Sequence, residues 1–71
     1  MRTVFIVWNE NQTEGFVTDD RQDAYDASTG QRRDGQSSVG MDFWDTYGTD
    51  LDEGDTLVVE EVQVTNVGED T

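Results

Sequence analysis

The hydrophobic residues of this chain gather in two stretches, with mostly polar sequence between them. The first is Val4-Phe5-Ile6-Val7-Trp8, and a short run of β-branched and aromatic residues favours a strand. Because nothing polar interrupts the run, we expect a central strand that is covered on both faces or nearly so. The second stretch, Leu57-Val58-Val59 followed by Val62 and Val64, predicts a last strand over residues 56–65.

The apolar positions of this last strand change phase along its length. Leu57 and Val59 are two residues apart, as are Val62 and Val64, but Glu60-Glu61 shifts the second pair by one position. Side chains alternate between the two faces of a strand. The pattern therefore predicts either a β-bulge at Glu60-Glu61 or a strand that is buried on both faces at its start.

Between these stretches the sequence predicts a hairpin and a helix. A polar turn over residues 9–13 separates the first strand from a short strand over residues 14–18. Thr18 or Asp19 can cap a helix over residues 19–29, and Asp19 with Gln22 has the form of a capping box. Gly30 is a natural stop for this helix.

The segment from Ser38 to Tyr47 fits two structures. Apolar residues at odd-numbered positions suit a half-buried strand: Val39, Met41, Phe43 and Tyr47. Phe43, Trp44 and Tyr47 also fit one face of a short helix. Taking the strand, we expect a ββαββ order and an α+β fold: a small antiparallel sheet of three to four strands with one helix packed on a face.

The chain is long enough for one domain, which we place at residues 1–65, followed by a flexible acidic tail at residues 66–71. The hairpin-plus-helix opening over about residues 3–28 resembles the start of many small phage and microbial proteins, and the resemblance supports the fold. No signal peptide or run of about 18 apolar residues is present. We therefore expect a soluble, cytoplasmic protein that spans no membrane.

Composition excludes several classes of function. Seventeen acidic residues stand against four arginines, with no Lys, His or Cys, and the formal net charge is -13. Such a chain has no basic patch for nucleic acid, and it lacks the thiolates and imidazoles used by many catalytic and metal sites. A two-carboxylate hydrolase remains conceivable but needs a cleft. We expect a protein that is not an enzyme, binds no nucleic acid directly and needs no cofactor.

The acidic run from Asp50 to Asp55 resembles the opening of a calcium loop. Its oxygen ligands would be Asp50, Asp52 and Asp55 for Ca²⁺ or Mg²⁺. The glycine departs from that pattern, since it stands at the fifth position of the run and not the sixth. The alternative is an acidic turn before a strand, with Gly54 supplying a positive φ.

Negative charge is distributed unevenly along the chain. Residues 1–40 carry seven acids and four arginines, whereas residues 41–71 carry ten acids and no basic residue. We expect Arg32-Arg33 to offset nearby acids, on Asp34 or on the helix. The expected partner-binding surface comprises Asp42, Asp45, Asp50, Asp52, Glu53, Asp55, Glu60 and Glu61, with Trp44 as an apolar anchor. A secondary acidic face would comprise Asp19, Asp23 and Asp26.

Carboxylates two apart on a strand or four apart on a helix lie about 6 Å apart, near the spacing of phosphates along one DNA strand. In size, charge and lack of catalytic groups the chain resembles the small acidic DNA-mimic inhibitors of phages, including anti-CRISPR and anti-restriction proteins. The resemblance implies a monomer or homodimer that blocks a basic groove on a DNA- or RNA-handling enzyme in the host cytoplasm. A salt-adapted (halophile) domain or an acidic accessory module with a protein partner would also explain the composition.

Overall fold

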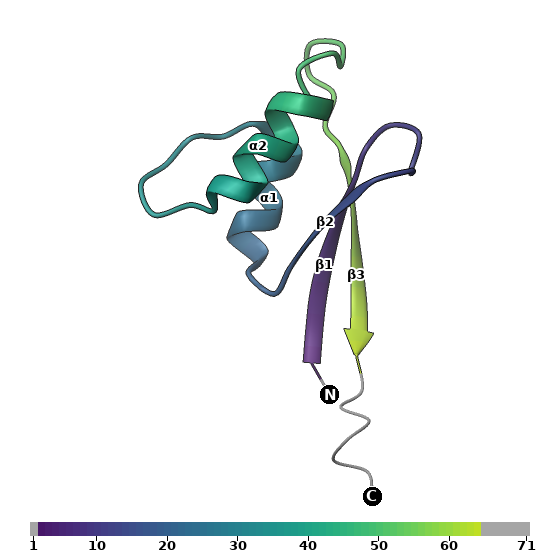
Figure 1. The fold of residues 1–71 in the computed structure, drawn as a ribbon, viewed down its shortest axis with the longest axis vertical. Coiled ribbons are helices and arrows are strands. Elements are labelled where there is room, and N and C mark those ends of the chain that lie inside the picture. The colour runs from purple at the N-terminus through teal and green to yellow at the C-terminus, as the bar shows by residue number, and fades with distance from the viewer. Residues whose placement is uncertain (1, 65–71) are drawn as a thin grey trace, which may run out of the picture.

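The computed structural model describes residues 2–64, which form an α+β fold (Figure 1). In chain order the elements are the strands β1 (Arg2–Trp8) and β2 (Gly15–Thr18), the helices α1 (Arg21–Thr29) and α2 (Ser38–Tyr47), and the strand β3 (Val58–Val64). The α+β class is therefore confirmed, but the order is ββααβ. The predicted tail at residues 66–71 lies outside the described residues.

The three strands form one antiparallel sheet in the order β2-β1-β3. The first hydrophobic stretch is thus the central strand, as predicted. Both helices pack on the same face of the sheet, and α1 also packs against α2. The other face of the sheet carries no helix among residues 2–64 (Figure 1), so the expectation that β1 is covered on both faces is wrong.

The segment from Ser38 to Tyr47 is a helix, which corrects the predicted strand. Ser37 caps its start, because the Ser37 hydroxyl accepts a hydrogen bond from the Gly40 N–H at 3.2 Å. In this helix the ring centroids of Phe43 and Tyr47 lie 4.8 Å apart. The odd-numbered apolar positions were compatible with both structures, and a local cap together with packing against α1 decides for the helix.

Helix α1 begins slightly later than the sequence predicts and ends where it predicts. Asp20 is the N-cap, since its side chain accepts hydrogen bonds from the N–H groups of Gln22 and Asp23. The N-cap is therefore one residue later than Asp19, and the predicted capping box of Asp19 with Gln22 is wrong. Gly30 ends the helix in the left-handed conformation with φ 79°, as its position indicates.

Strand β3 pairs with β1 without interruption, so the predicted bulge at Glu60-Glu61 is wrong. Every residue from Val58 to Val64 has a partner in register, from Trp8 back to Arg2. Since opposite residues share a face, Val59 lies on the helix-covered side with Val7, while Val58 and Val62 lie on the open side. The change of phase reflects apolar residues on both faces of one regular strand.

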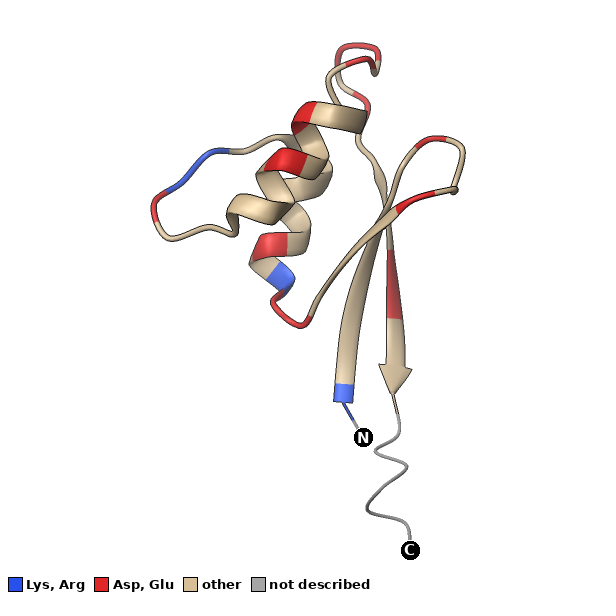
Figure 2. Cartoon of the chain, viewed as in Figure 1, with Lys and Arg blue, Asp and Glu red and all other residues tan. Residues whose placement is uncertain are grey.

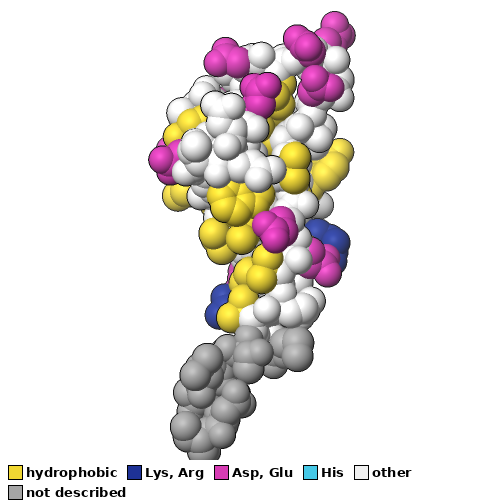
Figure 3. All heavy atoms as spheres, turned by 90° about the vertical axis from the view of Figure 1, so that its right-hand side faces the viewer, with side chains coloured by type: hydrophobic (Ala, Val, Ile, Leu, Met, Phe, Trp, Pro, Cys, Tyr) yellow, Lys and Arg dark blue, Asp and Glu magenta, His cyan; other side chains and the backbone are white. Residues whose placement is uncertain are grey.

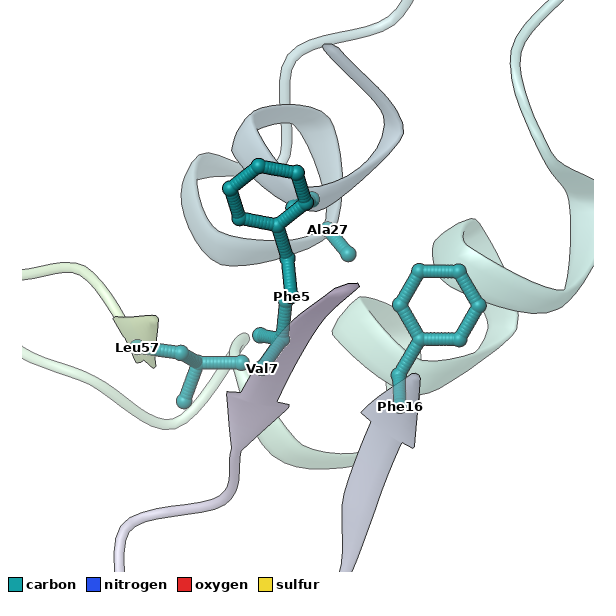
Figure 4. Packing of buried hydrophobic residues seen from close by; sticks show 6 residues of the cluster. Phe5, Val7, Phe16, Ala27 and Leu57 are labelled. Carbon is teal, nitrogen blue, oxygen red and sulfur yellow. The ribbon is translucent and has the colours of Figure 1, made fainter. Parts of the chain in front are cut away.

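The core lies between the sheet and the helices (Figure 4). Its buried members come from β1, β2, α1 and the residue before β3: Phe5, Val7, Phe16, Ala24, Ala27 and Leu57. Phe43, Trp44 and Leu51 pack against this cluster and close it from the side of α2. Neither helix of residues 2–64 is long and apolar enough to cross a membrane.

Candidate functional site

Two acidic loops leave the sheet at the same end. The loop over residues 9–14 follows Trp8 and precedes Gly15, and the loop over residues 49–57 precedes Val58. Trp8 pairs with both Gly15 and Val58, which places the two loops beside each other at this end (Figure 2). Together they carry six exposed carboxylates, which we call the acidic end: Glu10, Glu14, Asp50, Asp52, Glu53 and Asp55.

The first of these loops is organised by Asn9. Although Asn9 is buried, its side-chain oxygen accepts hydrogen bonds from the N–H groups of Thr13 and Glu14, at 2.8 and 3.1 Å. Its amide nitrogen donates to the Thr13 hydroxyl at 2.9 Å. These bonds fold the turn around one side chain and fix the backbone at Glu14, whose carbonyl also accepts a hydrogen bond from the Asn9 N–H at 3.0 Å. Glu10 lies in the same turn. The sequence marked this segment only as a polar turn.

The second loop is held mainly by backbone hydrogen bonds. Leu51 N–H donates to the Gly48 carbonyl at 3.2 Å, and Asp55 N–H donates to the Asp52 carbonyl at 3.0 Å. Gly54 takes a φ of 89°, as expected for an acidic turn before a strand. Among residues 2–64, no three carboxylates come close enough to form a metal site, and this applies to the predicted cation ligands Asp50, Asp52 and Asp55.

A shallow hollow of about 330 Å³ opens beside the second loop. Thr29 and Trp44 line it together with Asp52, Glu53 and Asp55. Trp44 also packs against the core, so the predicted anchor is a half-buried ring that borders both the core and the acidic loop. The hollow combines an aromatic surface with carboxylates, and such surfaces favour cationic side chains.

All four arginines of the chain form ion pairs with side chains away from the acidic end. Arg2 pairs with Asp19, Arg21 with Glu61, and Arg32 with Asp45, at 3.1, 3.3 and 2.7 Å. Arg33 pairs with Asp23 at 3.0 Å and with Asp26 at 2.6 Å. Arg33 thus offsets acids on the helix, as expected. The six carboxylates of the acidic end have no arginine partner in the described structure.

The other acids of the predicted surface are dispersed. Asp42 and Asp45 lie on α2, and Asp45 is paired with Arg32. Glu60 and Glu61 are neighbours on β3 and therefore project to opposite faces of the sheet. Glu60 accepts a hydrogen bond from the indole N–H of Trp8 at 3.0 Å on the open face. Of the predicted set, the fold brings together only the four acids of the second loop.

The predicted secondary face consists of carboxylates that are each bound within the molecule. Asp26 is only 1% exposed. Its oxygens accept hydrogen bonds from the side-chain amides of Gln22 and Gln36, besides the contact with Arg33. Asp23 accepts from the Ser37 N–H and pairs with Arg33. These two carboxylates tie the loop before α2 to α1.

The open face of the sheet carries a second feature, an apolar surface. Its members alternate along the three strands: Val4, Ile6, Trp8, Val17, Val58, Val62 and Val64. Val17 and Val58 are 60% and 57% exposed. Hydrophobic side chains form a band along the molecule, with acidic groups beside it, on the side shown in Figure 3. The change of phase in the last strand was the sequence signal for this surface.

Comparison with known protein families, with curated proteins and with solved structures finds no match to this chain.

Proposed function

We propose that this chain is a non-enzymatic acidic binding protein that occupies a basic groove on a DNA- or RNA-processing enzyme and blocks it, as phage-encoded mimics of nucleic acid do. The observation that carries the proposal is the acidic end. Six exposed carboxylates on two adjacent loops have no arginine partner there, while every arginine of the chain is paired elsewhere.

The physical argument is electrostatic. At physiological ionic strength the Debye length is about 8 Å, so carboxylates within one end of a small domain add their fields. A surface of one sign speeds encounter with a surface of the opposite sign and selects against partners of like charge. Grooves that bind nucleic acid are strongly basic, and they are therefore the best complement to the acidic end.

The hollow beside the second loop adds a contact that charge alone does not give. Arginine and lysine side chains of a basic groove would find Trp44 and the carboxylates of Asp52 and Asp55 within one concave surface. Aromatic rings and cations attract each other by about 0.5–2 kcal/mol, depending on how far water is excluded. Such a contact supports specificity for a protein surface over small cations.

A competition assay tests the proposal. Labelled duplex DNA is bound to each of a panel of restriction, CRISPR and polymerase enzymes, and the protein is added at about 0.1 M salt. We expect displacement of the DNA from at least one enzyme, with an affinity that falls as salt rises. The variant D50N/D52N should compete less well, because it removes two charges of the acidic end.

The matched control is D34N/D42N, which removes the same charge from two exposed positions outside the acidic end that form no ion pair with an arginine. Equal loss in both variants would show that only net charge matters. Failure to displace DNA from every enzyme of the panel would contradict the proposal. If the protein instead folds only towards molar salt, by circular dichroism, its acids serve salt adaptation, which is the competing explanation of the composition.

A further inference from the structure

Among residues 2–64, no strand pairs with the outer edge of β3. β1 pairs with the other edge at all seven residues. Six of its seven residues are exposed. Proteins usually protect such an edge with a short strand, proline, a bulge or charged side chains, and of these β3 has only the charges of Glu60 and Glu61. The free N–H and C=O groups of this edge can therefore accept a further strand.

An apolar groove lies directly beside this edge on the helix-covered face. It has a volume of about 260 Å³ and lies between α1 and β3. Phe5, Ala24, Tyr25 and Val59 line it, and Arg21 and Ser28 complete its lining. Tyr25 and Val59 are 54% and 40% exposed. A strand added at about 4.8 Å from β3 would direct every second side chain towards this groove. The residue opposite Val59 would be one of them.

Charge identifies the occupant of the edge. Glu60 and Glu61 stand at the middle of β3 and present one carboxylate to each face. A second copy of β3, paired antiparallel near the centre of the strand, would place Glu60 opposite Glu61 or Glu61 opposite its own copy. Like charges directly opposite each other destabilise a strand pair. A strand with basic residues at these two positions would instead place a cation opposite Glu60 and a second opposite Glu61, whose carboxylate also forms an exposed ion pair with Arg21 at 3.3 Å.

We propose that the outer edge of β3 binds an extended segment of a partner protein by antiparallel strand addition, with two consecutive basic residues opposite Glu60 and Glu61 and apolar residues opposite Val58, Val59 and Val62. Backbone hydrogen bonds supply affinity in this mode of recognition, and alternate side chains supply specificity. The inference goes beyond the proposed function, because it concerns the side of the sheet and not the acidic end.

The test uses a peptide of sequence TTVRRVV, blocked at both ends, whose arginines face Glu60 and Glu61 in the proposed register. Binding to the full-length ¹⁵N-labelled protein is followed by NMR at about 0.15 M salt. We expect alternate amides of β3 to become protected from exchange and Tyr25 to shift. The isomeric peptide RTVVTVR, with its arginines moved to the ends, should bind more weakly.

Two variants with the same net charge distinguish binding at the edge of β3 from general electrostatic attraction to the acidic chain. E60Q/E61Q should weaken binding of TTVRRVV by about 2- to 30-fold, the effect of two cross-strand charge pairs. E10Q/E14Q removes two glutamates from the acidic end and should change the affinity by less than about 1.5-fold, because exposed charges beyond a Debye length are screened.

Three results would overturn the inference: equal binding of both peptides, protection confined to the loops of the acidic end, or a dimer in sedimentation that E60Q/E61Q strengthens. The last would assign the edge to a second copy of this chain. None of these results depends on the DNA competition assay, so the inference and the proposed function can fail separately.

Discussion

The guanidinium Nε of Arg33 lies 2.6 Å from Oδ2 of Asp26, a carboxylate that is almost wholly buried against the helices. The Arg33 Nε–H is not aligned for a hydrogen bond, so the contact is an ion pair. One of the seventeen acids is thus part of the interior, and a basic residue from a surface loop compensates it. This pairing fixes the loop between α1 and α2, and with it the position of α2 over the core.

Replacing Arg33 should destabilise the fold much more than replacing its neighbour. R33A leaves Asp26 buried without its counter-charge, which costs about 3–5 kcal/mol when nothing else compensates. The amides of Gln22 and Gln36 remain, so we expect the lower end of this range. R32A breaks only the exposed pair with Asp45, worth about 0–1 kcal/mol. Urea unfolding of the two variants checks the difference, and equal losses would contradict it.

Two glycines with the same backbone conformation should differ in their tolerance of alanine. Gly30 and Gly35 have φ of 79° and 81°. A Cβ at Gly35 would meet no atom within 4 Å, whereas one at Gly30 would overlap the indole ring of Trp44 at Cε2. In both variants the left-handed conformation of the alanine should lower the free energy of unfolding by about 1–2 kcal/mol.

G30A must also displace the indole, which should add about 1–3 kcal/mol. Thermal unfolding measures both variants. The near-ultraviolet circular dichroism of Trp44 should change in G30A and stay as in the parent protein in G35A. A G35A variant as unstable as G30A would show that the indole does not press on Gly30.

The hairpin of the acidic end should depend on Asn9. N9A removes the acceptor of two backbone N–H groups and should cost about 1–3 kcal/mol, because those donors lose their partner in a part-buried turn. N11A, two residues away on an exposed side chain, should change the free energy of unfolding by less than about 0.5 kcal/mol. Hydrogen exchange at Thr13 and Glu14 gives a local measurement, and unchanged exchange in N9A would exclude this role.

The acidic end should destabilise the free protein in dilute buffer. Like charges on adjacent loops repel one another, so D50N/D52N should raise the free energy of unfolding at about 0.02 M salt. The gain should shrink at about 1 M salt, where the Debye length falls to about 3 Å. Denaturant titrations at the two salt concentrations test this. A gain independent of salt would mean that the substitutions act through contacts and not through charge.

The sequence alone determined the parts of this fold that rest on local chemistry. Five consecutive apolar residues define β1 as the central strand, and Gly30 ends α1 because it can adopt a positive φ at little cost. The acidic turn at Gly54 follows from the same property. The uneven charge of the chain, -3 over residues 1–40 and -10 over residues 41–71, also follows from the sequence alone.

Only the tertiary structure decided which face each residue occupies and which charges are free. Ser38 to Tyr47 satisfied the periods of both a strand and a helix, and packing against α1 selected the helix. The sequence predicted that Asp26 belongs to an acidic surface, whereas in the fold it is buried beside Arg33 of the loop. Pairing between residues far apart in sequence is a long-range property. Only the folded arrangement therefore separates the unpaired carboxylates of the acidic end from the acids that are paired in the interior.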